Sequence, residues 1–144
     1  MKKFLMLIAL AACNPYLTQQ SVAPPGRAAR LDEVTGFWGT VKHYRLEISE
    51  GVALALTCNK GAPCERVNVV SEDPAIAEVR PASLAKLESS PYTMQNQQPA
   101  SAFVIVGKAP GKTKLHLRAA QGKRDIVVTV VAPPPPPNQQ TAAQ

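Results

Sequence analysis

Short runs in which apolar and polar residues alternate fill most of the chain between residues 41 and 132, and they constrain its fold more than any other feature. In HYRLEIS (43–49), Leu46 and Ile48 alternate with polar neighbours, and Ile126 and Val128 begin the same pattern in DIVVTVV (125–131). A period of two places the apolar side chains on one face of a β-strand. The period of 3.6 that is typical of a helix is not sustained anywhere.

Seven short strands follow from this pattern, and turn residues separate most of them. The expected strands are 43–49, 52–58, 65–71, 75–79, 103–106, 114–118 and 125–131. Glycine or proline stands in the intervening segments 50–51, 72–74, 107–111 and 121–123. These residues favour turns, because glycine accepts a positive φ and proline fixes its own φ. Short, regularly spaced strands with such turns predict an all-β sandwich or barrel.

The first residues, MKKFLMLIALAAC, have the order of an export signal. Two lysines precede the apolar run 4–11, which is much shorter than the roughly 20 residues of a membrane-spanning helix. Small residues and then Cys13 follow, and this end resembles the lipobox of bacterial lipoproteins. In that family the cysteine becomes the new N-terminus and carries acyl chains such as palmitate. The resemblance implies lipidation of Cys13; an ordinary signal peptide with an incidental cysteine is the alternative.

Charge and the residue after Cys13 bear on location and partners. In the enteric form of the lipoprotein family an aspartate there retains the protein at the inner membrane, so Asn14 implies the outer membrane, with the protein facing the periplasm. The chain has 16 basic and 10 acidic residues, and loss of Lys2 and Lys3 with the signal leaves 14 against 10, a net charge of +4. This mild, dispersed charge and the export signal argue against a nucleic-acid partner.

The remaining cysteines, Cys58 and Cys64, flank the turn-forming sequence NKGAP. Exported proteins fold where disulfides persist, so the spacing predicts a bridge that closes a short loop and contributes about 2 kcal/mol. A metal site would need further ligands, and neither His43 nor His116 has ligand spacing to these cysteines. We therefore expect no metal and no cofactor.

Three segments lack sustained alternation and define the expected domain boundaries. Segment 1–12 is the signal peptide, 13–35 a disordered lipid-anchored tether, 36–132 the sandwich, and 133–144 a disordered Pro-rich tail. Pro24-Pro25-Gly26 interrupts the tether, and five prolines impose extended polyproline II geometry on the start of the tail. The Gln-rich stretch 89–101 is the longest irregular insertion within the domain.

Apolar side chains in these irregular segments are the candidate contacts to a partner. They are Tyr16, Leu17 and Val22 in the tether, Phe37 and Trp38 between two glycines, and Tyr92 and Met94 in the Gln-rich stretch. Each group also has an alternative without a partner. The tether residues would belong to a free linker, the aromatic pair would pack against the domain edge, and the Gln-rich stretch would be an unconstrained insertion. An exposed aromatic pair would favour partner binding.

Two sequence stretches are similar to known domains. SEDPAIAEV (71–79) and FVIVGKAPGKTKLHLRAAQGKRDIVVTV (103–130) resemble the bacterial immunoglobulin-like group 2 domain. The same phrases are similar to the small N-terminal domain found ahead of pilus secretins. Both resemblances imply an immunoglobulin-like β-sandwich, although the 58–64 loop and the 80–102 stretch depart from both patterns.

No motif indicates catalysis. The chain has no Ser/His/Asp spacing of a hydrolase, no glycine-rich phosphate loop and no acidic pair in a shared motif. His43 and His116 stand beside polar residues and are expected at the surface or an edge. We expect no enzyme and no small-molecule substrate. The resemblances imply a lipid-anchored structural or accessory subunit of a secretion or pilus assembly that contacts envelope proteins. The alternative is a free immunoglobulin-like lipoprotein that binds a glycan, peptidoglycan or another surface ligand.

Overall fold

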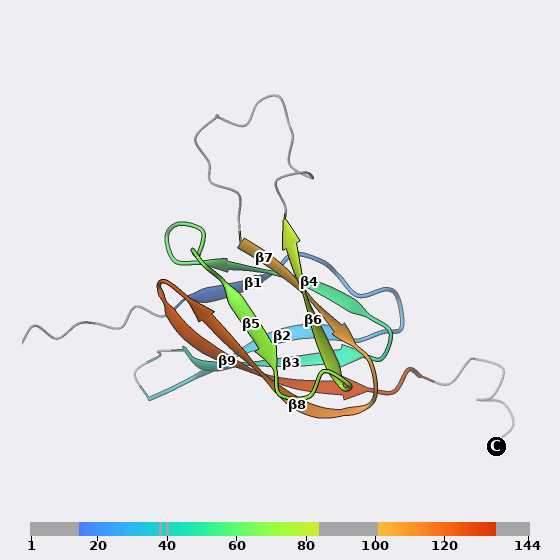
Figure 1. Cartoon of the computed structure of the whole chain (residues 1–144). Helices are drawn as coiled ribbons and strands as arrows, with labels where there is room; N and C mark the ends of the chain where they lie inside the picture. Colours follow the sequence, from blue (N-terminus) through green and yellow to red (C-terminus); the bar gives the residue numbers. More distant parts are fainter. Residues whose placement is uncertain (1–14, 38, 40, 84–100, 135–144) are drawn as a thin grey trace, which may run out of the picture.

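The computed structural model describes residues 15–37, 39, 41–83 and 101–134, and over these residues the chain is all-β. Nine strands are present in the described part of the chain, and they form two facing sheets (Figure 1). Their bounds are β1 Tyr16–Gln19, β2 Ala29–Thr35, β3 Val41–Ser49, β4 Ala53–Asn59, β5 Asn68–Ser71, β6 Ala77–Ser83, β7 Ser101–Gly107, β8 Gly111–Ala119 and β9 Gly122–Val131.

The two sheets have four and five strands, in the orders β1-β4-β7-β6 and β2-β3-β9-β8-β5. Neighbouring strands are antiparallel except for β3 and β9, which run parallel with Leu46 opposite Val128. The all-β sandwich predicted from the sequence is confirmed. All seven predicted strands exist, as β3 to β9, but the prediction omitted two.

The two additional strands, β1 and β2, lie within the segment that we predicted to be a disordered tether, so that prediction is wrong for residues 16–19 and 29–35. β1 pairs with β4 and β2 pairs with β3, each at the outer edge of its sheet. Leu17 is buried at 5% exposure, and Leu31 packs against the core. Between the strands, Pro24 and Gly26 do break the chain direction, in a turn where Arg27 N–H donates to the Pro24 carbonyl at 3.1 Å. The sandwich therefore begins at residue 16 instead of 36.

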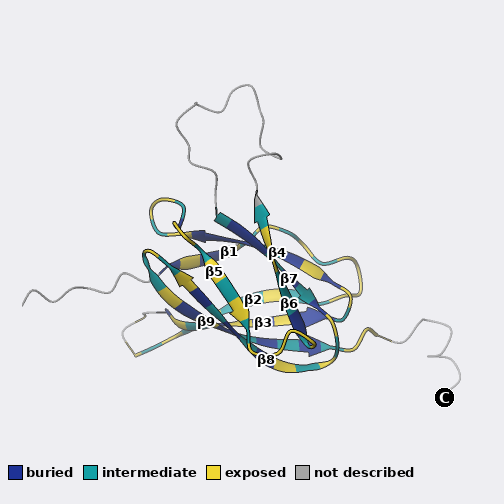
Figure 2. Cartoon of the chain, viewed as in Figure 1, coloured by how far each residue is buried: buried dark blue, intermediate teal, exposed yellow. Residues whose placement is uncertain are grey.

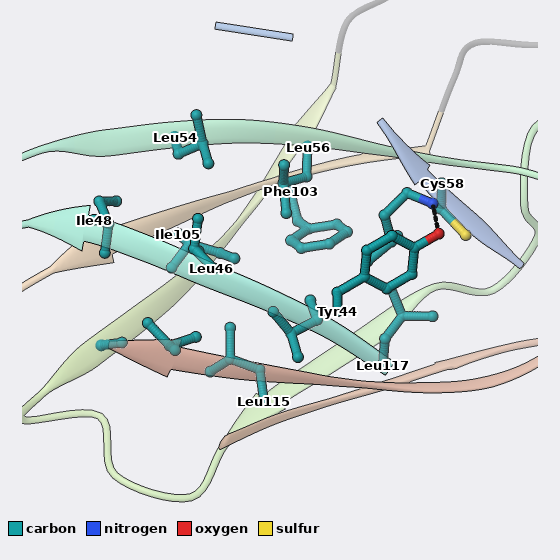
Figure 3. Close-up of a cluster of buried hydrophobic side chains, with 14 of the residues drawn as sticks. Tyr44, Leu46, Ile48, Leu54, Leu56, Cys58, Phe103, Ile105, Leu115 and Leu117 are labelled. Atoms are coloured by element: carbon teal, nitrogen blue, oxygen red, sulfur yellow. Dashed lines mark hydrogen bonds between the residues drawn. The ribbon is translucent and has the colours of Figure 1, made fainter. Parts of the chain in front are cut away.

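The core lies between the sheets and is almost wholly aliphatic (Figures 2 and 3). Its fully buried side chains come from both layers and include Leu46, Ile48, Leu54, Leu56, Ile105, Leu115, Leu117, Ile126 and Val128. Tyr44 is the one aromatic side chain among the completely buried residues of the described chain. Its hydroxyl accepts a hydrogen bond from the Leu17 N–H at 2.9 Å, which ties β1 to β3 (Figure 3).

The strands connect two distinct ends of the sandwich. At the entry end lie Pro15, the β2–β3 loop, the β4–β5 connection 60–67 and the β8–β9 turn at 120–121, on the left of Figure 1. At the exit end lie the connection 20–28 and the turns 50–52, 72–76 and 108–110, and the chain leaves there after β9. The two ends of the described chain therefore lie at opposite ends of the sandwich.

Candidate functional site

A buried arginine holds the entry end together. Arg124, on β9, is only 7% exposed. Its Nε donates to the Pro15 carbonyl at 3.1 Å and its Nη1 donates to the Val41 carbonyl at 2.6 Å. One guanidinium thus joins the start of the described chain to the first residue of β3 and to β9. Sequence reasoning missed this role, because an arginine between a lysine and an aspartate beside a turn has the pattern of a solvated residue.

The predicted Cys58–Cys64 disulfide is confirmed and lies at the same end. The two Cα atoms are 5.3 Å apart, and the side chains are buried at 1% and 2% exposure. The loop is also closed by backbone contacts, since Cys64 N–H donates to the Cys58 carbonyl at 3.1 Å and Asn59 bridges Pro63. The pair therefore stabilises a compact loop and offers no reactive thiol.

A basic hollow of about 420 Å³ opens at the entry end, and Arg124 is among its lining residues. Exposed cations line it from three strands: Lys42 on β3, Arg118 on β8 and Lys123 on β9. Arg118 and Lys123 lie directly opposite each other across the β8–β9 pair. The one acidic group among the lining residues, Asp125, is bonded to His116. The hollow therefore suits an anionic group.

His116 lies between two carboxylates on the outer face of the five-stranded sheet. Its Nδ1 is 2.8 Å from Asp125 Oδ1 and its Nε2 is 2.8 Å from Glu72 Oε1. These bonds, first that to Asp125 and then that to Glu72, raise the pKa of the imidazole above its ordinary value. Both ring nitrogens are occupied, so the cluster joins the end of β5 to β8 and β9 and leaves no nitrogen for proton transfer to a substrate.

The outer faces of the two sheets differ over their central strands. On the four-stranded sheet, the outward positions of the central strands β4 and β7 carry small or neutral side chains: Ala53, Ala55, Thr57, Ala102, Val104 and Val106. The outward positions of the five-stranded sheet are mostly charged: Arg30, Asp32, Arg45, Glu47, Lys112, Lys114, His116, Arg118, Lys123 and Asp125. The flanking strand β6 is charged on this side as well, because Glu78 lies opposite Val106 and Arg80 lies opposite Val104. The neutral face is therefore the strip over β4 and β7 alone, and it is unusual because an outer sheet face in contact with water is normally polar.

The predicted partner contacts have mixed outcomes. Leu17 is a core residue, so its prediction as a contact is wrong; it faces Tyr44 and Cys58 because β1 is a sandwich strand. Tyr16 is 53% exposed, Val22 91% and Phe37 94%. Phe37 lies at the entry end and Val22 in the connection at the exit end, so the structure does not bring these three together. Cys13, Trp38, Tyr92 and Met94 lie outside the described residues.

The described part of the chain has neither a membrane-spanning helix nor a metal-binding cluster. Across these residues no helix is long and apolar enough to span a bilayer. Nor do three or more histidine, cysteine or acidic side chains come together there in a way that could hold a metal ion.

Comparisons with known proteins place the chain in no family. No protein family matches it, and no curated protein does. Solved structures that match include domains 4 and 5 of the S-layer protein SbsC, with 18% identity, a TM-score of 0.42, and coverage of 83% of this chain and 54% of that one. SbsC domains 5–6 match at 18% identity and a TM-score of 0.38, over 82% of this chain and 45% of that chain. This chain thus spans about half the length of those structures, and so distant a likeness says nothing about function.

Proposed function

We propose that this protein is a lipid-anchored, non-enzymatic subunit of a cell-envelope assembly. Acyl chains on Cys13 would hold it at the outer membrane, facing the periplasm, and it would act through contacts with other envelope proteins of a secretion or pilus machine. The export signal and the lipobox-like cysteine support the location. The role as a contact-making subunit rests on one surface of the sandwich.

That surface is the neutral face, the strip over β4 and β7 on the outside of the four-stranded sheet, which the Glu78–Arg80 pair of β6 borders. Val104 and Val106 on β7 lie beside Ala55 and Ala53 on β4. All four side chains point away from the core, because the alternate residues Leu54 and Ile105 are the fully buried ones. A strip of a sheet without charge can pack against another protein at little desolvation cost. The charged face of the other sheet would lose more hydration in such a contact, so the neutral face is the better docking surface.

The polar chemistry supports a role without catalysis. His116 has both ring nitrogens bonded to carboxylates, and Arg124 is buried against backbone carbonyls. The cysteines are joined to each other. These strongly interacting groups all serve the fold.

The test is purification of the full-length lipoprotein from its own envelope in a gentle detergent, followed by native mass measurement. We expect a stoichiometric, high-mass complex. Val104→Lys would place a charge on the neutral face and remove the partner. Val127→Lys is the matched control, because Val127 is a half-buried valine pointing outward on the other sheet. Equal thermal melting of both variants would show that folding is retained.

Recovery of a monomer, or loss of the partner with both variants alike, would contradict the proposal. A second function is favoured by the basic hollow of Lys42, Arg118 and Lys123, which suits an acidic glycan on the cell surface. Co-purification of anionic glycan with the monomer, and its loss on Lys123→Gln, would support that alternative.

A further inference from the structure

The entry end of the sandwich lies next to the proposed lipid attachment point. Pro15 is fully buried, and its carbonyl is held by Arg124. Cys13 precedes Pro15 by two residues, so their Cα atoms are at most about 7 Å apart even in an extended chain. Any lipid on Cys13 would therefore enter the membrane directly beside this end, and no long tether separates the domain from the bilayer.

Charge is unequally distributed between the two ends. The difference lies in the described connecting segments at each end and in the two strand residues on either side of each segment. At the entry end these carry the cations Lys42, Lys60, Arg66, Arg118 and Lys123 and one anion, Glu65. At the exit end they carry Arg27, Arg30, Lys108 and Lys112 against Glu50, Glu72, Asp73 and Glu78. The entry end is therefore strongly positive, and the exit end is balanced.

Exposed aromatic residues accompany this charge. Phe37, at the tip of the β2–β3 loop, is 94% exposed, and Tyr16, at the start of β1, is 53% exposed. Aromatic rings favour the boundary between water and lipid, where an apolar body and polar surroundings are both satisfied. The same end thus presents basic groups, aromatic groups and the nearby lipidation residue.

We propose that the entry end is a membrane-facing surface, on which Lys42, Arg118 and Lys123 bind anionic lipid headgroups and Phe37 enters the interface. This inference rests on the proposed acylation of Cys13 and goes beyond it, because acyl chains alone attach a domain without orienting it. Basic side chains near an anionic bilayer each add to association. Here they would fix the direction in which the domain stands.

This orientation has a consequence for the docking surface. The strands run between the entry end and the exit end, so a domain resting on its entry end holds its sheets upright from the membrane. The neutral face of Val104 and Val106 would then point sideways, parallel to the bilayer. Other envelope proteins in the same membrane could reach it there.

The experiment compares two exposed apolar positions in the full-length acylated protein. Benzoylphenylalanine, a photo-crosslinking amino acid, replaces Phe37 in one preparation and Val22 in the other. Val22 is the matched control, since it is 91% exposed and lies at the exit end. Each protein is reconstituted into vesicles of phosphatidylethanolamine with about one third phosphatidylglycerol, a composition that gives an anionic surface. We expect at least fivefold more lipid crosslinking from position 37 than from position 22.

Charge removal provides the second arm. The triple variant Lys42→Gln, Arg118→Gln and Lys123→Gln should bring the 37-to-22 crosslinking ratio close to one, because each cation near the surface contributes about fivefold to association. A control variant removes three cations from the exit end instead: Arg27→Gln, Lys108→Gln and Lys112→Gln. It should leave the ratio unchanged. Vesicles of phosphatidylethanolamine alone should also lower the ratio.

Failure of the inference and failure of the proposed function are distinguishable. The mass of the N-terminal peptide reports acylation directly, and an unmodified Cys13 overturns both. An acylated protein with equal lipid crosslinking at positions 37 and 22 overturns the orientation alone. Crosslinking of position 37 to a protein or glycan instead of lipid, in native envelopes, also overturns it and assigns the basic end to that ligand.

Discussion

The two ends of the sandwich are built by different means. At the exit end, ordinary backbone hydrogen bonds close the turns: Gly51 N–H donates to the Gly107 carbonyl at 2.8 Å, and Glu50 N–H donates to the Val131 carbonyl at 2.9 Å. At the entry end, a disulfide and a buried guanidinium supply the ties. The arginine joins residues 109 positions apart in the sequence. The difference teaches that the entry end relies on side-chain links in addition to its backbone bonds, whereas backbone bonds alone join the distant segments 50–51, 107 and 131 at the exit end.

Loss of the Arg124 guanidinium is the most damaging change that we predict. Arg124→Met keeps an apolar stem but leaves the Pro15 and Val41 carbonyls without their charged donor, so we expect a loss of about 3 kcal/mol in the free energy of unfolding. Urea denaturation measures it. Arg27→Met is the control, because Arg27 makes an exposed bond of 3.4 Å to a backbone carbonyl at the exit end. Similar losses from both variants would contradict the contrast between the ends.

Removal of the disulfide should rank second. The double variant Cys58→Ala, Cys64→Ala releases the loop in the unfolded chain and should lower the free energy of unfolding by about 2 kcal/mol. Reduction of the unaltered protein with dithiothreitol should have an effect of the same size, and the double variant should not respond to the reductant. If dithiothreitol lowered the free energy of unfolding of the double variant as well, the effect of the reductant would not come from this disulfide.

A smaller effect is expected from a side chain that supports the exit end. Thr113 Oγ1 accepts a hydrogen bond from the Asp73 N–H at 3.1 Å, and Thr113 is 8% exposed. Thr113→Val preserves the shape of the side chain but leaves the Asp73 N–H without its acceptor. We expect the free energy of unfolding to fall by about 1 kcal/mol. Amide hydrogen exchange should quicken in residues 72–76 and remain slow at Cys64. Faster exchange at Cys64 would show that the two ends are coupled.

The smallest effect concerns pH. Because the pKa of His116 is raised in the folded state, its charged form stabilises the fold at pH values below the ordinary imidazole pKa of 6.5. That contribution is lost as the pH rises through the raised value. NMR titration should therefore find the His116 midpoint above 6.5, and Asp125→Asn should lower it. A midpoint that does not move in Asp125→Asn would show that this carboxylate is not the main cause.

The central strands and the edge strands β5 and β6 could be predicted from the sequence, whereas the edge strands β1 and β2 could not. β3, with Leu46 and Ile48, and β9, with Val128, alternate clearly because each has one face against the core and neighbours on both sides. β2 alternates weakly: the position opposite Tyr44 is an exposed glutamate, Glu33, since an edge strand need not bury its whole inner face. β1 has one buried apolar side chain, Leu17, too few to set a period.

The site residues follow a similar rule. The disulfide could be predicted because both cysteines and their turn lie within one short segment. The His116 cluster could not, because Glu72 is 44 positions away and reaches the imidazole only through the pairing of β5 with β8. Arg124 is the hardest case. A buried arginine whose acceptors are backbone carbonyls has no acidic partner in the sequence to reveal it.

The ten-residue strand β9 sets a height. It begins at the entry end, next to Arg124, and ends where the chain leaves the sandwich. At about 3.3 Å per residue it spans about 30 Å. If the entry end rests on the membrane, Pro133 starts at roughly the thickness of a bilayer's hydrocarbon core above the lipid surface. A partner that binds the chain beyond residue 133 would then lie in the aqueous space, at the opposite end of β9 from the lipid.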